Sequence, residues 1–346
     1  MTDYKNLKLI ATSNPHIRGK DTTRSIMLDV CIALMPALLW AIYRFGFEAL
    51  LLSAVSVGAC AFWEWGYRKV MKKPQSVGDL SFAVTGLLLS FVCPVTTPLW
   101  MIIIGDFFAI VVVKQLFGGI GTNFLNPALG GRAMLLASYA GVMTRWIDPA
   151  NGWAPVCILD SNVDIVSAAT PLSYMKGSGD AVAASFADLV SKYSVADMFL
   201  GMTGGSMGEI SSLLVLVGGI YLIIRKVISW QIPVSYIGTV AVLTLLFPKA
   251  GGIDWMLYSI FGGGLMLGAF FMATDYATSP VTPKGQIIYG IGCGLFTVFI
   301  RYFGSYNEGV CYSIMVMNLC VALIDKYTKP TRFGVVKAEK KEAAAK

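Results

Sequence analysis

Long apolar segments are the feature that most limits what this chain can fold into. About 20 apolar residues suffice to cross a bilayer as a helix, and ten segments approach that length, at roughly residues 25–44, 47–67, 79–93, 98–117, 125–143, 209–228, 230–248, 255–273, 285–303 and 309–325. Of the 346 residues, 56% are hydrophobic and only 14% are charged, whereas soluble domains carry about 25% charged residues. The sequence therefore predicts an all-α integral membrane protein and excludes an ordinary soluble enzyme or a disordered chain.

The ten segments form two blocks of five, 25–143 and 209–325, which suggests an internal duplication. A shift of 186 residues, the separation of Pro94 and Pro280, places the first five segments close to the last five and Pro94-Val95-Thr96 on Pro280-Val281-Thr282. An odd number of spans in each block forces the two blocks into opposite orientations. We therefore expect two inverted five-helix repeats.

The distribution of Lys and Arg predicts the orientation of the chain, because positive residues are retained on the cytoplasmic side. With both termini inside, 20 of the 27 Lys and Arg residues lie in cytoplasmic segments, among them residues 1–24 and the tail 326–346. The polar segment 144–208, with six aspartates, then faces outward. The net charge of +7 follows from this bias and does not indicate a nucleic-acid partner. Residues 1–24 lack the apolar stretch of a signal peptide.

The spacing of the cysteines supports neither a metal site nor a disulfide framework. The seven cysteines are scattered, odd in number and mostly within apolar segments, and no two form a Cys-x-x-Cys pair. Local spacing therefore builds neither a disulfide framework nor a zinc or iron–sulfur site. We assign no metal ligand and no catalytic side chain.

The outward segment contains a threonine in an unusual setting, Asp164-Ile165-Val166-Ser167-Ala168-Ala169-Thr170-Pro171-Leu172. Pro171 biases Thr170 away from helix toward an extended backbone, which would hold the hydroxyl out from the chain. The two alanines before Thr170 leave room for a bulky group. An ordinary surface turn is the alternative interpretation of Ala-Thr-Pro.

This motif resembles the acceptor sequence Asp-x-x-Ser-Ala-Ala-Thr of flavin transferases, in which FMN is joined through its phosphate to the threonine hydroxyl. The resemblance makes Thr170 the acceptor, with Asp164, Ser167 and Ala169 completing the motif. Ser-Ala-Ala-Thr-Pro-Leu is also similar to the Ser-Gly-Ala-Thr-Pro-Leu of the D subunits of Rnf electron-transport complexes and the B subunits of sodium-pumping NADH:quinone reductases. This chain differs at Ala168, where glycine is usual, and at Ile165, where a small residue is usual.

The resemblance extends over almost the whole chain. It includes the sequence from Ser13 to Arg18, the sequence from Gly118 to Ala133 and the sequence from Ala273 to Pro283. The length is similar to that of the Rnf D subunits, whereas the reductase B subunits usually carry a longer amino-terminal extension. We therefore favour the Rnf D subunits and keep the reductase B subunits as the alternative.

The family resemblance implies a function. It implies a multi-pass subunit of the bacterial cytoplasmic membrane with an architecture similar to that of urea channels, and a covalent FMN together with a second, noncovalent flavin such as riboflavin. It implies a flavin transferase for maturation and, as partners, Rnf subunits that bring iron–sulfur clusters, another covalent flavin, and the NADH-binding and ferredoxin-interacting functions. The complex would pass electrons between reduced ferredoxin and NAD while moving sodium ions or protons.

The sequence from Gly118 to Ala133 also suggests a ligand site. Asn126 suits a helix N-cap and Pro127 the first turn, so the positive end of the fifth helix would face a polar pocket suited to a phosphate or a polar flavin edge. We assign Asn123, Asn126 and Arg132 to cofactor binding. One alternative is the plain start of a membrane helix. Another is a water channel of the Asn-Pro-Ala type, but the second half has Tyr312-Ser313-Ile314 at the matching position.

Charged residues within membrane segments are functional candidates, because each costs about 2.5–3.5 kcal/mol at a helix centre. They are Asp29, Glu64, Asp106, Arg132 and Asp275. Asp29 and Glu64 lie near segment ends and could pair with basic loops. Asp106 and Arg132 are candidates either for a mutual ion pair or for ion or flavin contact. Asp275 lies in a Thr-, Ser- and Pro-rich break, where it could contact an ion or a flavin or cap a helix.

Three functions remain open from the sequence. The first is a redox carrier, in which the flavin carries the electrons because no side chain here does so at physiological potentials. The second is a flavin-free transporter or channel, since fold alone is weak support for function. The third is a membrane scaffold for other subunits.

Overall fold

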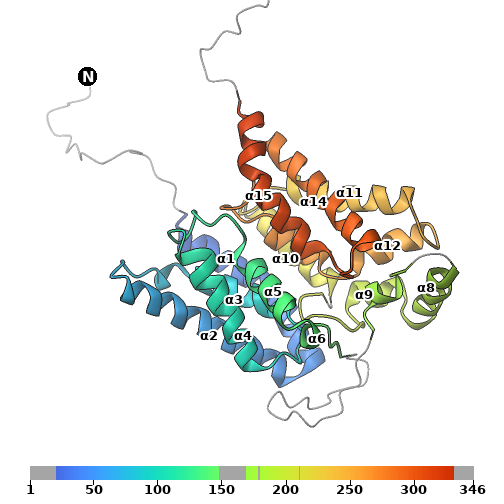
Figure 1. Cartoon of the computed structure of the whole chain (residues 1–346), viewed down its shortest axis with the longest axis horizontal. Coiled ribbons are helices and arrows are strands. Elements are labelled where there is room, and N and C mark those ends of the chain that lie inside the picture. The colour runs from blue at the N-terminus through green and yellow to red at the C-terminus, as the bar shows by residue number, and fades with distance from the viewer. Residues whose placement is uncertain (1–20, 148–168, 178–179, 210, 331–346) are drawn as a thin grey trace, which may run out of the picture.

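The computed structural model describes residues 21–147, 169–177, 180–209 and 211–330, and every regular element in them is a helix (Figure 1). Asp164 and Ser167 of the acceptor motif lie outside the described residues. The helices before the polar segment are α1 (Thr23–Phe45), α2 (Phe47–Val70), η2 (Val77–Asp79), α3 (Ser81–Val92), α4 (Leu99–Phe107), the π-helical η3 (Phe108–Gln115), α5 (Pro127–Ser138) and α6 (Ala140–Met143).

Three helices follow in the polar segment, α7 (Pro171–Tyr174), α8 (Asp180–Lys192) and α9 (Val195–Leu200). The remaining elements are α10 (Ser212–Ile224), α11 (Gln231–Leu246), α12 (Ile253–Phe261), α13 (Leu265–Leu267), the π-helical η5 (Gly268–Met272), α14 (Pro283–Phe303) and α15 (Val310–Thr328). Each of the ten apolar segments coincides with one of these helices or with a broken run of them. The all-helical class of the prediction is confirmed.

Fewer helices than expected are long enough to cross a bilayer unbroken. Within the described ranges, α1, α2, α14 and α15 have the length and hydropathy of a membrane span, and α12 together with α13 and η5 makes a fifth if the 63° bend between them is allowed. The helices α3, α10 and α11 are apolar but shorter. The protein is thus a multi-pass membrane protein with four or five full-length candidate spans, and the ten-span inverted repeat stays a prediction.

The helices form two groups that share one hydrophobic core. In Figure 1 the blue-to-green helices α1 to α6 lie on one side, and α11, α12, α14 and α15, in yellow to red, lie on the other. Helix α10 packs along α1, and α5 contacts α15, so both groups meet at these pairs. The core is continuous between the groups and includes Leu34, Leu89, Tyr236 and Tyr289.

A second, smaller core holds the polar segment against α12. Leu172, Phe186, Tyr193 and Met198 from α7, α8 and α9 and the turns between them pack on Trp255 and Tyr258. The hydroxyl of Tyr258 donates a hydrogen bond of 2.5 Å to the carbonyl of Tyr193. This layer fixes the start of α7, and with it Thr170, next to the break between α12 and α13.

The start of α5 agrees with the prediction from its sequence. Asn126 is the N-cap, and its Oδ1 accepts hydrogen bonds from the backbone N–H groups of Ala128 and Leu129 at 3.0 and 3.5 Å. Its Nδ2 donates to the carbonyl of Met272 at 3.2 Å. Asn126 therefore both begins α5 and ties it to the end of η5 in the other half of the chain.

Candidate functional site

Thr170 is extended and lies at the start of α7, as the following proline predicts. Its φ and ψ are −69° and 154°, and Pro171 occupies the first helical turn. The carbonyl of Thr170 accepts hydrogen bonds from the N–H of Ser173 at 2.9 Å and from the Ser173 hydroxyl at 2.6 Å. Thr170 does not face open solvent, because the residue is only 9% exposed and lines a cavity.

This cavity, the Thr170 cavity, has a volume of about 90 Å³. It lies between the second half of α5, the start of α7, the turn after α12 and the loop between α14 and α15. Its lining includes Arg132, Leu136, Trp146, Thr170, Phe261, Glu308, Tyr306 and Tyr312. Two residues that the sequence analysis assigned separately, Thr170 and Arg132, are thus brought together.

Arg132 is a buried cation held by two carboxylates. It is 5% exposed, and its Nη1 donates to Glu308 Oε1 at 3.0 Å while its Nη2 forms a second, shorter contact with Glu308 Oε2. Glu209 Oε1 lies 4.0 Å from Nη2. Because bidentate pairing of this kind fixes geometry as well as charge, Arg132 joins α5 to the loop before α15.

The ion pair with Asp106 that the sequence suggested as one option for Arg132 does not form. Asp106 Oδ1 instead lies at hydrogen-bond distance from Ser56 Oγ, 2.8 Å away, and accepts a hydrogen bond from Cys60 Sγ at 3.2 Å. The two residues lie on neighbouring helices, but Arg132 points to the Thr170 cavity while Asp106 faces α2. Asp106 does not line the Thr170 cavity.

Arg301 fixes two backbone segments beside the Thr170 cavity, the end of α12 and the loop before α15. Its Nε donates to the carbonyl of Glu308 at 2.9 Å, its Nη1 to the carbonyl of Ser259 at 2.5 Å and its Nη2 to that of Gly262 at 3.3 Å. These carbonyls belong to the loop before α15 and to the last turn and end of α12. One cation thus satisfies two carbonyls at the end of α12, where the helix leaves acceptors free, and one in the loop before α15.

The side chains of the Thr170 cavity suit one edge of the flavin that the acceptor motif implies. The volume of about 90 Å³ is well below the range of about 300–1,000 Å³ for small-molecule pockets, so the cavity does not enclose the whole ring. A flavin presents a flat ring and a dianionic phosphate. Tyr306 and Tyr312 are stacked at 4.8 Å between ring centroids, and Trp146 and Phe261 add further aromatic surface. The guanidinium of Arg132 supplies positive charge, although Glu308 and Glu209 already balance it. The chemistry present suits a flavin ring better than it suits a free anion.

A second cavity of about 290 Å³, the Asn126 cavity, collects the other predicted residues. Asn123, Asn126 and Asp275 line it together with Lys114, Thr85 and Thr274 and with an apolar wall that includes Phe270 and Phe271. Its volume is close to the lower end of the range of about 300–1,000 Å³ for small-molecule pockets. Asn126 and Leu136, one from each cavity, are ten residues apart on α5, about 15 Å along a helix.

The remaining charged candidates form ion pairs or hydrogen bonds, as expected for residues near segment ends. Arg225 Nη2 lies 3.0 Å from Asp29 Oδ2, and the Tyr221 hydroxyl donates to Asp29 Oδ1 at 3.0 Å. Glu64 is fully buried and pairs with Lys114 at 2.8 Å. Asp275 accepts a hydrogen bond from Thr278 at 3.3 Å. Ala169, the last motif residue before Thr170, is exposed.

Three residues of the Thr170 cavity and its walls escaped the sequence analysis, namely Glu209, Glu308 and Arg301. Glu209 and Glu308 lie at the edges of apolar segments, where carboxylates are common. The only sequence signal was the glycine-flanked loop from Gly304 to Gly309, which places an acid and one aromatic residue, Tyr306, between two spans. In the described part of the chain, no group of three or more His, Cys, Asp or Glu side chains is placed to hold a metal ion.

Comparison with known proteins places this arrangement in a family. The model of the NQR2, RnfD, RnfE family matches residues 10–334. The D subunit of the Na⁺-translocating ferredoxin:NAD⁺ oxidoreductase complex of Acetobacterium woodii is 48% identical over 341 residues, covering 98% of this chain and 99% of that protein. The D subunit of the proton-translocating complex of Clostridium ljungdahlii is 43% identical over 333 residues, covering 95% of this chain and 97% of that protein.

The similarity to a more distant relative also extends over nearly the full length of both chains. The D subunit of the ion-translocating oxidoreductase complex of Actinobacillus succinogenes is 35% identical over 354 residues, covering 93% of this chain and 97% of that protein. The similarity therefore includes both halves of the helical core and the polar segment between them. This chain belongs to the NQR2, RnfD, RnfE family.

Proposed function

We propose that this protein is the D subunit of an ion-translocating ferredoxin:NAD⁺ oxidoreductase, the Rnf complex, and that it carries electrons through FMN esterified to Thr170. The similarity to D subunits over nearly the full length of both chains is the observation that carries the assignment to the complex. The support for the attachment site is local: the acceptor motif ends at a threonine that is extended and lines a cavity with aromatic walls.

The chain's own residues would position the cofactor. Thr170 Oγ1 would provide the oxygen of the phosphoester, and the buried layer of Leu172, Phe186 and Trp255 would hold that oxygen at a fixed place. Tyr306, Tyr312 and Trp146 would offer the ring an apolar surface, and Arg132 would set the local potential. The flavin, when bound, supplies one- and two-electron redox chemistry that no side chain here provides.

The Asn126 cavity is our candidate for the noncovalent flavin. It combines Asn123, Asp275 and Lys114, which suit the polar edge of a heterocycle, with an apolar wall. The amide of Asn126 is already engaged with the α5 backbone and Met272, so we assign it to shaping the cavity. A second flavin here would lie at the opposite end of α5 from Thr170.

We also propose a membrane topology and a set of partners for the subunit. We propose that residues 25–143 and 209–325 are inverted repeats in the bacterial cytoplasmic membrane, with residues 1–24 and 326–346 in the cytoplasm and 144–208 outside. The partners would be the other Rnf subunits, and a flavin transferase would complete maturation. The Acetobacterium woodii and Clostridium ljungdahlii relatives are named for sodium and for proton translocation, respectively, and the coupling ion is one of these two.

Thr170→Ala tests the attachment site. We expect the variant to reach the membrane in normal amount but to show no flavin fluorescence after denaturing electrophoresis, because the ester oxygen is missing. Thr144→Ala is the matched control, since Thr144 lines the same cavity and should keep full fluorescence. Undiminished fluorescence of Thr170→Ala, expressed with its flavin transferase, would refute the assignment.

A further inference from the structure

Asp106 is a buried carboxyl group that the flavin sites do not use. It lies on α4 and is 0% exposed. The nearby cations are engaged elsewhere, Lys114 with Glu64 and Arg132 with Glu308. Among the described residues, no Lys or Arg nitrogen is placed within ion-pair distance of Asp106. An ionised carboxylate in such a place carries a desolvation penalty that nothing offsets.

If Asp106 is ionised, the contacts of Ser56 with Asp106 and Gly86 need two protons, and the hydroxyl has one. Ser56 Oγ lies 2.8 Å from Asp106 Oδ1 and 2.9 Å from the carbonyl oxygen of Gly86, and both distances are those of a hydrogen bond. A serine hydroxyl has only one proton to donate. If Asp106 were a carboxylate, Ser56 would face two acceptors and one contact would have no proton in it.

A proton on Asp106 completes this set. Asp106 Oδ1–H then donates to Ser56 Oγ, and Ser56 donates its own proton to Gly86. The second lone pair of Oδ1 still accepts from Cys60 Sγ at 3.2 Å. Asp106 Oδ2 is buried with no hydrogen-bond partner among the described residues. Burial without a partner costs less free energy for the carbonyl oxygen of a neutral carboxyl group than for a charged carboxylate oxygen.

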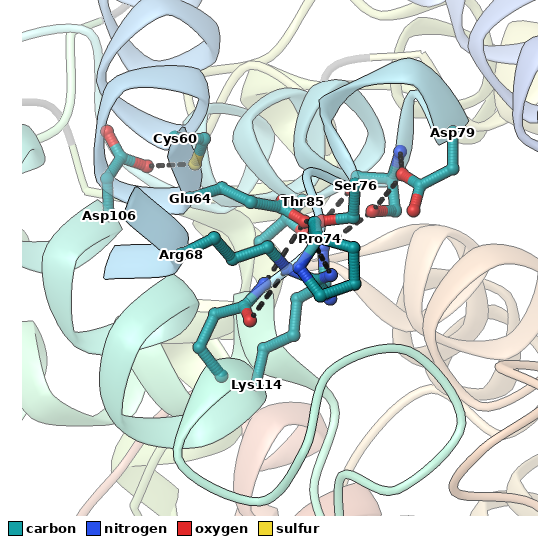
Figure 2. A network of polar contacts seen from close by, with 11 residues as sticks. Cys60, Glu64, Arg68, Pro74, Ser76, Asp79, Thr85, Asp106 and Lys114 are labelled. Carbon is teal, nitrogen blue, oxygen red and sulfur yellow. Dashed lines mark hydrogen bonds and ion pairs between the residues drawn. The ribbon is translucent and has the colours of Figure 1, made fainter. Parts of the chain in front are cut away.

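The surrounding helices, all within the described part of the chain, offer no free cation that would pair with the charged form. Figure 2 shows Cys60 and Asp106 together, apart from the group around Glu64 and Lys114. On α2 the titratable neighbours are Cys60 and Glu64, on η3 Lys114, and on α5 Arg132. Helix α3 has no titratable side chain, and Cys93 follows it directly. Lys114 pairs with Glu64 at 2.8 Å, so its charge is already balanced.

We propose that Asp106 is a proton-binding site: a carboxylic acid that keeps its proton at neutral pH by donating it to Ser56, inside the first group of helices. An ordinary aspartate has a pKa of about 3.9 and is ionised at pH 7. This site would give the protein an exchangeable proton in an apolar region without a fixed charge. The proposal does not depend on the flavin or on the partner subunits.

Infrared spectroscopy of the purified full-length protein tests the proposal directly. A protonated carboxyl group gives a carbonyl stretching band, well separated from the amide bands, that a carboxylate lacks. We expect this band at pH 7 in the wild type, a shift of the band in D₂O, and a loss of intensity from it in Asp106→Asn. Asp29→Asn is the matched control and should keep the band, because Asp29 is paired with Arg225.

A second variant keeps the test decisive if Asp106→Asn fails to fold. Ser56→Ala removes the acceptor of the proposed proton, so the band should move to higher frequency as the carboxyl loses its hydrogen bond. A wild-type spectrum at pH 7 without the band would overturn the proposal. So would a band that is identical in the wild type, in a folded Asp106→Asn variant and in Ser56→Ala.

Discussion

At the scale of single residues, Arg132 carries the main electrostatic interaction of the Thr170 cavity. It is the shared partner of Glu308 and Glu209, and all three groups are largely removed from water. The attraction within such a group offsets the cost of burying the charges only while every member is present. Removing the cation leaves two buried carboxylates near one another.

Arg132→Met should therefore destabilise the protein strongly. We expect a loss of about 3–5 kcal/mol in the free energy of unfolding, as for other buried pairs broken on one side, measured by equilibrium denaturation in detergent. Arg225→Met is the control, because Arg225 is 51% exposed where it pairs with Asp29, and it should leave the transition almost unchanged. Equal effects of the two variants would contradict the role given to Arg132.

The sequence predicted the local features of this site and missed its long-range ones. Pro171 alone predicts the extended backbone of Thr170, and Asn126-Pro127 predicts the start of α5, because both effects act between neighbouring residues. The partner of Arg132 is 176 residues away along the chain. Hydropathy contains no information on which distant carboxylate meets a buried cation, so Asp106 was considered as a partner and Glu308 was not.

At the scale of elements, the broken helices shape the site. The bend between α12 and α13 brings the backbone carbonyl of Gly262 to Arg301 and places Gly263 at the wall of the Thr170 cavity. Gly263 has a φ of +70°, and a Cβ there would meet Leu172 Cδ1 at 2.5 Å. The sequence predicted this region as one continuous span, because glycine is common in membrane helices and does not by itself mark a break.

Gly263→Ala should weaken this bend. The left-handed backbone costs an alanine about 1–2 kcal/mol, and the contact with Leu172 adds to that cost, so we expect a lower thermal transition of the detergent-solubilised protein. Gly238→Ala in the middle of α11 is the control, because its Cβ meets no atom within 4 Å. That variant should be neutral or gain up to about 1 kcal/mol, and an order of stability opposite to this would count against the strained turn.

At the scale of the whole molecule, the helix groups enclose two cavities, and the layer of α7 to α9 borders one of them. The Asn126 cavity lies at the start of α5 and the Thr170 cavity toward its end. The charge distribution predicts that the first faces the cytoplasm and the second the outside. The all-helical class and the positions of the apolar helices followed from hydropathy, whereas the lengths of the individual spans depended on breaks that hydropathy averages away.

Labelling of single cysteines tests this orientation. Ser191→Cys on α8 and Met71→Cys after α2 both place a thiol at an exposed position. In a background without the native cysteines, a membrane-impermeant maleimide should label Ser191→Cys in intact spheroplasts and Met71→Cys only after lysis. The reverse pattern would invert the topology and place the flavin acceptor in the cytoplasm.

The central claim is the covalent bond between Thr170 and FMN. Its most direct test is the intact mass of the protein purified from its native membrane, followed by mapping of the peptide that contains Thr170. We predict a mass increased by one FMN less one water, located on Thr170 and absent from every other peptide. A protein from a host with an active flavin transferase that has the mass of the bare polypeptide would contradict the account.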